Sequence, residues 1–246
     1  MTKTTEHIIL KTENLAIGYQ TKKQQKVIQN NINLNIKKGE LVAVLGKNGI
    51  GKSTLLRTLS NVQKPIDGSV FINQKNSNNF TNKELAQTLS LVLTERLPES
   101  QLTVYELIAL GRQPYTNWID RISDNDKSII DKAIALTEIS AFTNRRFYEL
   151  SDGQLQRVLI ARAIAQDTDI IILDEPSAHL DIHHSVKLFS LLKKLVEETD
   201  KTILISSHEV NLAVKFANTF IVLTVPDSTP SSVSTCLLYT SDAADD

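Results

Sequence analysis

One stretch of the chain, residues 46–54, restricts the possible fold more than any other. It reads GKNGIGKST and lies between the apolar run LVAVL (41–45) and the helical pattern KSTLLRTLS (52–60). Glycines at this spacing let backbone N–H groups turn toward phosphate oxygens, and the N-terminus of the following helix adds its positive end. The order of strand, glycine-rich loop and helix therefore predicts a phosphate-binding loop, in which Lys52 reaches the β and γ phosphates and Ser53 ligates Mg²⁺.

Two further strands are expected to end beside this loop. The apolar strand IIIL is followed by Asp174 and Glu175. We expect Asp174 to lie beside the Mg²⁺ bound at Ser53, and Glu175 to be the general base that activates water against the γ phosphate. His208 follows the strand TILISS and is expected to position that phosphate. Alone, an acidic pair ending a strand is more often a solvated turn, and a lone histidine a packed one, but the phosphate loop favours the functional interpretation.

The order of apolar patterns predicts an α/β fold. Strand and helix patterns alternate over residues 40–224, which indicates a mostly parallel sheet in a P-loop core. Residues 8–37 include a period-2 run and predict an antiparallel accessory sheet. Amphipathic segments dominate residues 80–150 and predict an inserted α-helical subdomain. We expect one domain over residues 1–225.

Composition restricts the partners and the compartment. The 246-residue chain has 27 basic and 28 acidic residues, so we expect local recognition of partners and no nucleic-acid binding. Its apolar runs are far shorter than the roughly 20 residues that span a bilayer. The single cysteine, Cys236, fits a reducing compartment, and we expect a cytosolic protein.

The C-terminal residues show no helical or strand period. Residues 236–246 read CLLYTSDAADD and resemble the conceptual translation of a sequencing adapter. We therefore expect this tail to be non-native and the natural sequence to stop at or before Thr235. The polar run at residues 226–235 cannot be assigned either way.

Three more motifs complete a resemblance to a known family. LSDGQLQRV (150–158) starts a helix, SAHLD (177–181) follows IIILDEP, and SSHE (206–209) includes His208. Over residues 8–224 the chain resembles the ATP-binding subunits of ABC transporters. The resemblance implies ATP and Mg²⁺ as cofactors, Lys52 and Glu175 as catalytic residues, and His208 as the switch histidine. Besides Lys52 and Ser53, the implied ATP-binding residues are Tyr19, Gly46, Asn48, Gly49, Gly51 and Thr54, of which Tyr19 stacks on adenine unless it is a buried strand tyrosine.

The resemblance also implies a head-to-tail dimer of two copies. In that arrangement the signature segment (residues 150–154) of one copy faces the γ phosphate bound by the other, through Ser151, Gly153 and Gln154. Asp181 is implied to couple the two copies, and the histidines of HLDIHH (179–184) are interpreted as a solvated or subunit-facing helix start rather than a metal site.

Two residues depart from the family pattern. Asp152 replaces the first glycine of the usual LSGGQ, a change compatible with phosphate binding through Ser151 and Gly153. Thr94 stands where the family has a glutamine that touches Mg²⁺ and senses the membrane partner. The role of Thr94 stays open.

One segment resembles a particular branch of the family. LTVYELIALGRQPYTNW (102–118) is similar to importers of iron complexes, heme and cobalamin. The resemblance implies a groove for membrane permease subunits, an indirect substrate-binding protein, and a peripheral position on the cytoplasmic side of the inner membrane. Aromatic and arginine side chains of this segment are candidates for the groove, although two of the aromatic ones could simply pack the subdomain: Tyr105, Arg112, Tyr115 and Trp118. A non-transport ABC ATPase and an importer of another metal complex are the alternatives.

Overall fold

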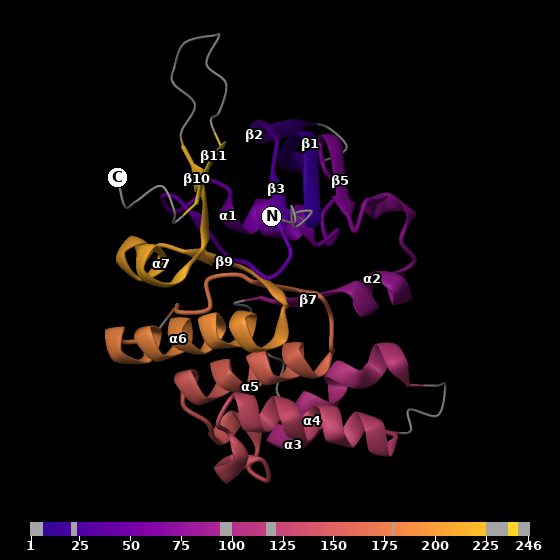
Figure 1. The fold of residues 1–246 in the computed structure, drawn as a ribbon, viewed down its shortest axis with the longest axis vertical. Helices are drawn as coiled ribbons and strands as arrows, with labels where there is room; N and C mark the ends of the chain where they lie inside the picture. The colour runs from indigo at the N-terminus through magenta and orange to yellow at the C-terminus, as the bar shows by residue number, and fades with distance from the viewer. Residues whose placement is uncertain are drawn as a thin grey trace, which may run out of the picture.

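A central six-stranded sheet organises the protein. The computed structural model describes residues 7–20, 24–93, 100–116, 122–178, 180–224 and 236–240. The sheet order is β11-β10-β4-β9-β8-β7, and all neighbours are parallel except β10 and β11 (Figure 1). The strands are β4 (Leu41–Leu45), β7 (Leu89–Val92), β8 (Ile170–Leu173), β9 (Thr202–Ser207), β10 (Thr219–Leu223) and β11 (Cys236–Thr240). The α/β prediction is confirmed, and each of β4, β9 and β8 has a neighbouring strand on both sides.

The continuous apolar runs follow from burial of both faces of this sheet. In β4, Leu41, Ala43 and Leu45 join one hydrophobic core, whereas Val42 and Val44 join the other. Successive side chains of a strand point to opposite faces, so a strand covered on both faces needs an apolar residue at every position.

The accessory sheet and α1 cover one face. This sheet is antiparallel, and its strands are β1 (Ile8–Gln20), β2 (Gln25–Ile32), β3 (Asn35–Lys37), β5 (Asp67–Ile72) and β6 (Lys75–Asn76). Its apolar side chains pack with α1 (Lys52–Leu59) against the central strands. The predicted antiparallel sheet at residues 8–37 is therefore present, with β5 and β6 added from later in the chain.

Helices cover the other face. The helices α5 (Asp152–Ala165), α6 (Ile182–Thr199) and α7 (Val210–Phe216) contribute to the second core, and α3 (Val104–Ala109) and α4 (Asp124–Leu136) pack against α5 (Figure 1). Helix α2 (Asn82–Thr88) precedes β7, so the mainly helical range 80–150 also supplies one strand of the central sheet. Short 3₁₀ helices span Ser77–Asn79, Leu110–Tyr115, Ser140–Phe142 and Phe147–Glu149.

Four of these helices begin with the same N-terminal capping motif. Helices α2, α3, α4 and α5 each start at a capping box, in which the N-cap hydroxyl and the side chain of the third helical residue bond each other's backbone N–H groups. The N-cap residues are Thr81, Thr103, Ser123 and Ser151. This pattern satisfies N–H groups that otherwise lack partners, so the sequence itself marks where the helices begin.

Part of the C-terminal tail forms a strand. Residues 236–240 form β11, whose backbone pairs with β10 from Leu223 opposite Cys236 to Thr219 opposite Thr240. A segment without helical or strand period can still form a strand, because an edge strand presents backbone groups that another strand can pair with whatever its side-chain pattern. A non-native origin of the tail stays a prediction, and residues 226–235 and 241–246 lie outside the described residues.

The structure corrects the role expected for Arg112. Its side chain is buried, with 3% exposure, and Nε donates to Asp126 Oδ1 at 2.8 Å while Nη1 donates to the Ala165 carbonyl at 2.8 Å. The Tyr115 ring lies 4.0 Å from the guanidinium. Arg112 therefore joins α4 and α5 inside the protein and is not a groove residue. Tyr105 packs against the core, and Trp118 lies outside the described residues.

We predict that Arg112→Ala lowers the free energy of unfolding by about 3 kcal/mol, because it leaves the buried Asp126 carboxylate without its charged partner. Hydrogen bonds from Ser123, and then Arg112, hold the pKa of Asp126 below its usual value. The stabilisation should therefore be complete above the unfolded pKa of about 3.9 and be lost as the pH falls through the lower folded value. Urea denaturation at pH 7 and pH 3 measures this.

Lys127→Ala is the control for this prediction, because the Lys127–Asp124 pair is exposed. Its unfolding should match that of the wild type. Equal denaturation midpoints for Arg112→Ala and Lys127→Ala would contradict a stabilising role for the buried pair.

Candidate nucleotide-binding site

The phosphate loop turns back sharply between β4 and α1. Gly46 and Gly51 have φ angles of 153° and 114°. A Cβ at Gly46 would lie 2.9 Å from the Leu223 carbonyl oxygen, and one at Gly51 would lie 2.8 Å from Ile28 Cγ2. Side chains are thus excluded at both positions by backbone conformation and by neighbouring atoms. The loop needs these glycines to bring the N-terminus of α1 into the site.

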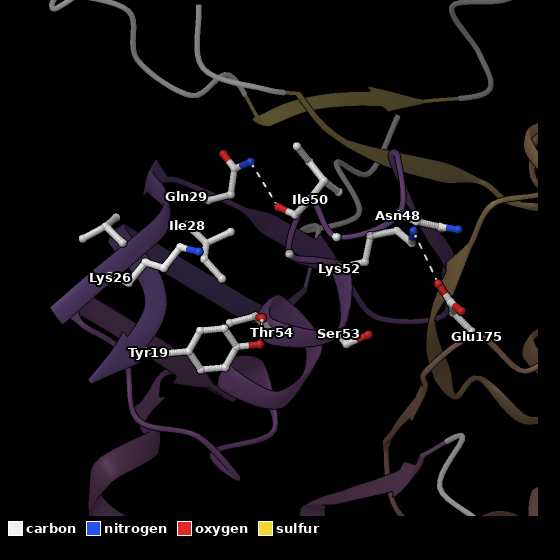
Figure 2. A pocket seen from close by; sticks show the side chains of 13 residues that line it. Tyr19, Lys26, Ile28, Gln29, Asn48, Ile50, Lys52, Ser53, Thr54 and Glu175 are labelled. Atoms are coloured by element: carbon white, nitrogen blue, oxygen red, sulfur yellow. Dashed lines mark hydrogen bonds and ion pairs between the residues drawn. The ribbon is translucent and has the colours of Figure 1, made fainter. Parts of the chain in front are cut away.

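A pocket of about 610 Å³ lies over this loop (Figure 2). Its volume is in the range of small-molecule sites. Its walls come from the loop, the first turn of α1, strand β2 and Glu175. The sequence-predicted residues that line it are Tyr19, Asn48, Gly49, Gly51, Lys52, Ser53, Thr54 and Glu175. Strand β2 adds Lys26, Val27, Ile28 and Gln29, which sequence reasoning missed because the β2 pattern indicates only a half-buried strand.

Gln29 fastens the loop to its surroundings. Its side chain is buried, and Nε2 donates to the Ile50 carbonyl at 3.3 Å and to the Thr224 carbonyl at 3.0 Å. One amide group therefore ties β2 to the phosphate loop and to the end of β10.

Tyr19 lies at the end of β1 with its ring on the wall of the pocket (Figure 2). Its hydroxyl is 3.2 Å from Thr54 Oγ1, and the residue is 54% exposed. The alternative of a buried strand tyrosine is therefore wrong. An accessible ring anchored at its hydroxyl suits stacking against a planar base.

Lys52 is the buried cation of the site. It is only 4% exposed, and Nζ contacts the carbonyl oxygens of Gly46 at 3.0 Å and Lys47 at 3.4 Å. Nζ also lies 3.4 Å from Glu175 Oε1 (Figure 2). The predicted phosphate ligand and the predicted base thus face each other across the loop.

A hydrogen-bond network joins the ends of three elements at the carboxyl edge of the sheet. Asp174 Oδ1 accepts from Ser53 Oγ at 2.9 Å and from Ser206 Oγ at 2.7 Å. Ser206 Oγ in turn accepts from the Glu175 backbone N–H at 2.7 Å. The parallel pairing of β4, β9 and β8 explains this convergence, because it brings the three carboxyl ends to one edge.

Ser206 is a site residue that the sequence analysis did not single out. It is fully buried, and it holds the backbone of Glu175, whose φ of 44° lies in the left-handed region that non-glycine residues rarely adopt. The segment SSHE (206–209) could have indicated Ser206, because a serine at the end of a central strand reaches the same edge of the sheet as Asp174 and Glu175.

The oxygens of Ser53 and Asp174 fit a magnesium ion. They lie 2.9 Å apart, and adjacent ligands of an octahedral ion with bonds of 2.0–2.1 Å are separated by about 2.9 Å. Within the described residues there is no group of three or more histidine, cysteine, aspartate or glutamate side chains that could hold a metal. Mg²⁺ typically binds through one or two carboxylates, phosphate oxygens and water, and Asp174 supplies one such carboxylate. Thr94 lies outside the described residues.

His208 is exposed and follows Ser207, whose partner on β4 is Leu45. This register places His208 beside the start of the phosphate loop. The structure thus brings His208 to the same edge as Glu175, although the described lining of the pocket does not include it.

The signature segment lies apart from this pocket. Ser151 caps α5, accepting from the Gln154 N–H at 3.3 Å, and Gln154 Oε1 accepts from the Ser151 N–H at 3.1 Å. Asp152 is exposed in the first turn, where a carboxylate favours the positive helix end. Gly153 lies against Leu180 and His184, close to the N-cap Asp181 of α6. No described pocket residue comes from the signature segment.

We predict that Ser206→Ala lowers kcat for ATP hydrolysis by about 10- to 100-fold, since it removes a hydrogen-bonding partner of both Asp174 and the Glu175 backbone. Nucleotide affinity should change less, because Lys52 and the loop remain intact. Steady-state hydrolysis and fluorescent-nucleotide titration separate the two effects.

The control is Ser207→Ala, a buried serine on the same strand that accepts from the Glu209 N–H instead. Its kcat should stay near that of the wild type. An equal loss of kcat in both variants would show that hydrolysis depends on the integrity of the end of β9 and not on the Ser206 hydroxyl.

Comparison with known proteins agrees with this geometry. The family model described as ABC transporter matches residues 29–178. An uncharacterised ABC transporter ATP-binding protein of Methanocaldococcus jannaschii is 39% identical over 210 residues, covering 85% of this chain and 71% of its own length. The iron(3+)-hydroxamate import ATP-binding protein FhuC of Bacillus subtilis is 37% identical (87% and 78%), and the petrobactin import ATP-binding protein FpuD of Bacillus anthracis is 36% identical (87% and 77%).

Solved structures show the same fold. The dimeric cassette MJ0796 bound to ADP and Pi is 32% identical with a TM-score of 0.76, covering 88% of this chain and 94% of that one. A chain of a protein described as a metal-chelate type ABC transporter is 27% identical with a TM-score of 0.80, covering 96% and 85%. The phosphate loop, the acidic pair and the matched sequence lead to one conclusion: this chain belongs to the ABC transporter family, as an ATP-binding subunit with ATPase activity.

Proposed function

We propose that this chain hydrolyses ATP to drive import of an iron(III) chelate of the siderophore type. Relatives at 36–37% identity are import ATP-binding proteins for iron(3+)-hydroxamate and for petrobactin, and this observation carries the proposal. Two copies would bind membrane permease subunits at the cytoplasmic face, and the permease would receive its substrate from a binding protein. Among the described residues, none of the helices has the length and apolar composition of a membrane span.

The site geometry supports a separate role in ATP binding or hydrolysis for each of several side chains. Loop N–H groups and Lys52 bind the β and γ phosphates, while Tyr19 stacks on adenine. Ser53 and Asp174 would hold Mg²⁺, which would neutralise charge on the phosphates when bound. The Glu175 carboxylate accepts the proton of the attacking water, and His208 aligns the γ phosphate.

Gly153 supports a site shared between two copies. A Cβ at this position would lie 3.6 Å from Leu180 and His184, which is ordinary van der Waals contact. Gly153 therefore differs from Gly46 and Gly51, because nothing within the described chain excludes a side chain there. A glycine at the N-terminus of a 14-residue helix fits close approach of a phosphate held by another molecule. We infer that this phosphate is the γ phosphate bound by a second copy, arranged head to tail.

Gly153→Ala tests the shared site. We expect unfolding stability to stay the same or rise by up to about 1 kcal/mol, since alanine favours helix and fits the space. ATP affinity of the monomer should be unchanged, whereas hydrolysis should fall about 100-fold because the methyl group displaces the phosphate. Thermal unfolding, nucleotide titration and phosphate release measure the three quantities. Normal turnover in this variant would refute the shared site.

The transport role is tested with the full-length protein purified together with its permease. In lipid vesicles with the cognate binding protein, ferric hydroxamate should raise ATP hydrolysis severalfold, and Glu175→Gln should abolish the increase. Heme, cobalamin and another metal chelate are the competing substrates. Stimulation by one of these alone would replace the siderophore assignment. If no membrane protein copurifies with the chain, a non-transport ABC ATPase is favoured.

A further inference from the structure

His184 lies between the starts of two helices, α5 and α6, whose residues are not among the described lining of the nucleotide pocket. Its backbone N–H donates to Asp181 Oδ1 at 2.8 Å, and its ring Nδ1 lies 2.8 Å from the same oxygen. An ionised carboxylate only accepts hydrogen bonds, so Nδ1 is the donor. The other side of the ring faces the signature segment, since its Cδ2 would lie 3.6 Å from a Cβ added at Gly153. One imidazole is thus hydrogen-bonded to the N-cap of α6 and lies beside the first turn of α5.

Stability of the fold does not require this ring. The Asp181 and His184 side chains are 64% and 54% exposed, and an exposed pair of this kind contributes little to stability. The helix cap itself needs only the backbone N–H of residue 184, which every non-proline residue supplies. The hydrogen bond from the His184 ring to Asp181 is therefore not needed for stability. Its effect is on the position of Asp181 relative to Gly153.

The ionised state of Asp181 is consistent with a carboxylate held in one position by His184. The backbone hydrogen bond from His184, followed by the one from its ring, holds the pKa of Asp181 below its usual value. The carboxylate therefore stays ionised at neutral pH, with Oδ1 bonded twice by one residue. Without the ring, Asp181 would lose one of these bonds, and the space beside Gly153 and Leu180 would open.

We propose that His184 is a positioning residue that holds Asp181 and the signature segment as a single unit presented to the second copy. This inference rests on the proposed shared site, because only in that site do Asp181 and the signature segment face a second copy. His184 contacts neither nucleotide nor Mg²⁺ in this arrangement. Its effect is on closure of the dimer and on turnover, while ATP binding by the separate chain depends on Lys52 and the phosphate loop.

Three variants of the full chain test the proposal. His184→Ala removes the ring, His184→Asn keeps an N–H near the position of Nδ1, and His183→Ala removes the neighbouring exposed histidine. The His183 ring lies edge-on to that of His184 at 5.9 Å, and within the described residues it makes no side-chain hydrogen bond, so it is a matched control. For each variant we would measure kcat, KM, the midpoint of thermal unfolding, and ATP affinity at low protein concentration. ATP-dependent dimerisation would be followed by light scattering in a Glu175→Gln background.

We expect His184→Ala to lower kcat and the dimerisation constant about tenfold each, with ATP affinity of the separate chain and unfolding unchanged. His184→Asn should recover both to within about threefold of the wild type, because the amide restores the bond to Asp181. His183→Ala should match the wild type throughout.

Two results would overturn the proposal. One is wild-type turnover and dimerisation in His184→Ala. The other is an equal loss in the alanine and asparagine variants with earlier unfolding, which would indicate a purely structural side chain. Failure of the Glu175→Gln chain to dimerise with ATP, when His184 is intact, would instead reject the shared site itself. The two failures are therefore distinguishable.

Discussion

The carboxylate oxygen Oδ1 of Asp174 is the point on which the site depends. It accepts hydrogen bonds from Ser53, at the start of α1, and from Ser206, at the end of β9. Ser206 also holds the backbone N–H of Glu175, so one oxygen and one hydroxyl set the relative positions of the phosphate loop, the metal ligands and the general base. Because three parallel strands end here, the groups arrive at one edge without long connections.

Much of this arrangement could be predicted from the sequence, because it depends on local patterns. Strands β4 and β8 are apolar at every position, and β9 contains the apolar run ILI at 203–205. Continuous apolar strands are typical of a sheet that is covered on both faces. The glycines of the phosphate loop are required by backbone geometry, and Asp174 and Glu175 immediately follow a strand. Adjacency to a strand end therefore predicts where Asp174 and Glu175 lie, whereas their roles in hydrolysis stay predictions.

Other features depend on contacts across the chain, which no local pattern reveals. Arg112 is a candidate groove residue from sequence because arginine is enriched at interfaces, but Asp126, fourteen residues later, supplies a buried partner. Ser206 and Gln29 contribute hydrogen bonds to groups distant in sequence, so their residue types alone did not distinguish them. Strand β11 forms through backbone pairing, which side-chain periodicity does not detect. The role assigned to His208 stays a prediction, and the role of Thr94 stays open.

The separation of the pocket from the signature segment has a kinetic consequence. If two copies must meet to complete a site, the rate per chain depends on how often copies meet, and it falls when the protein is dilute. A permease that binds two copies side by side would raise their effective concentration to the millimolar range typical of tethered partners. Chains without a permease would then hydrolyse little ATP, because at low concentration the equilibrium between separate and paired copies favours the separate chains.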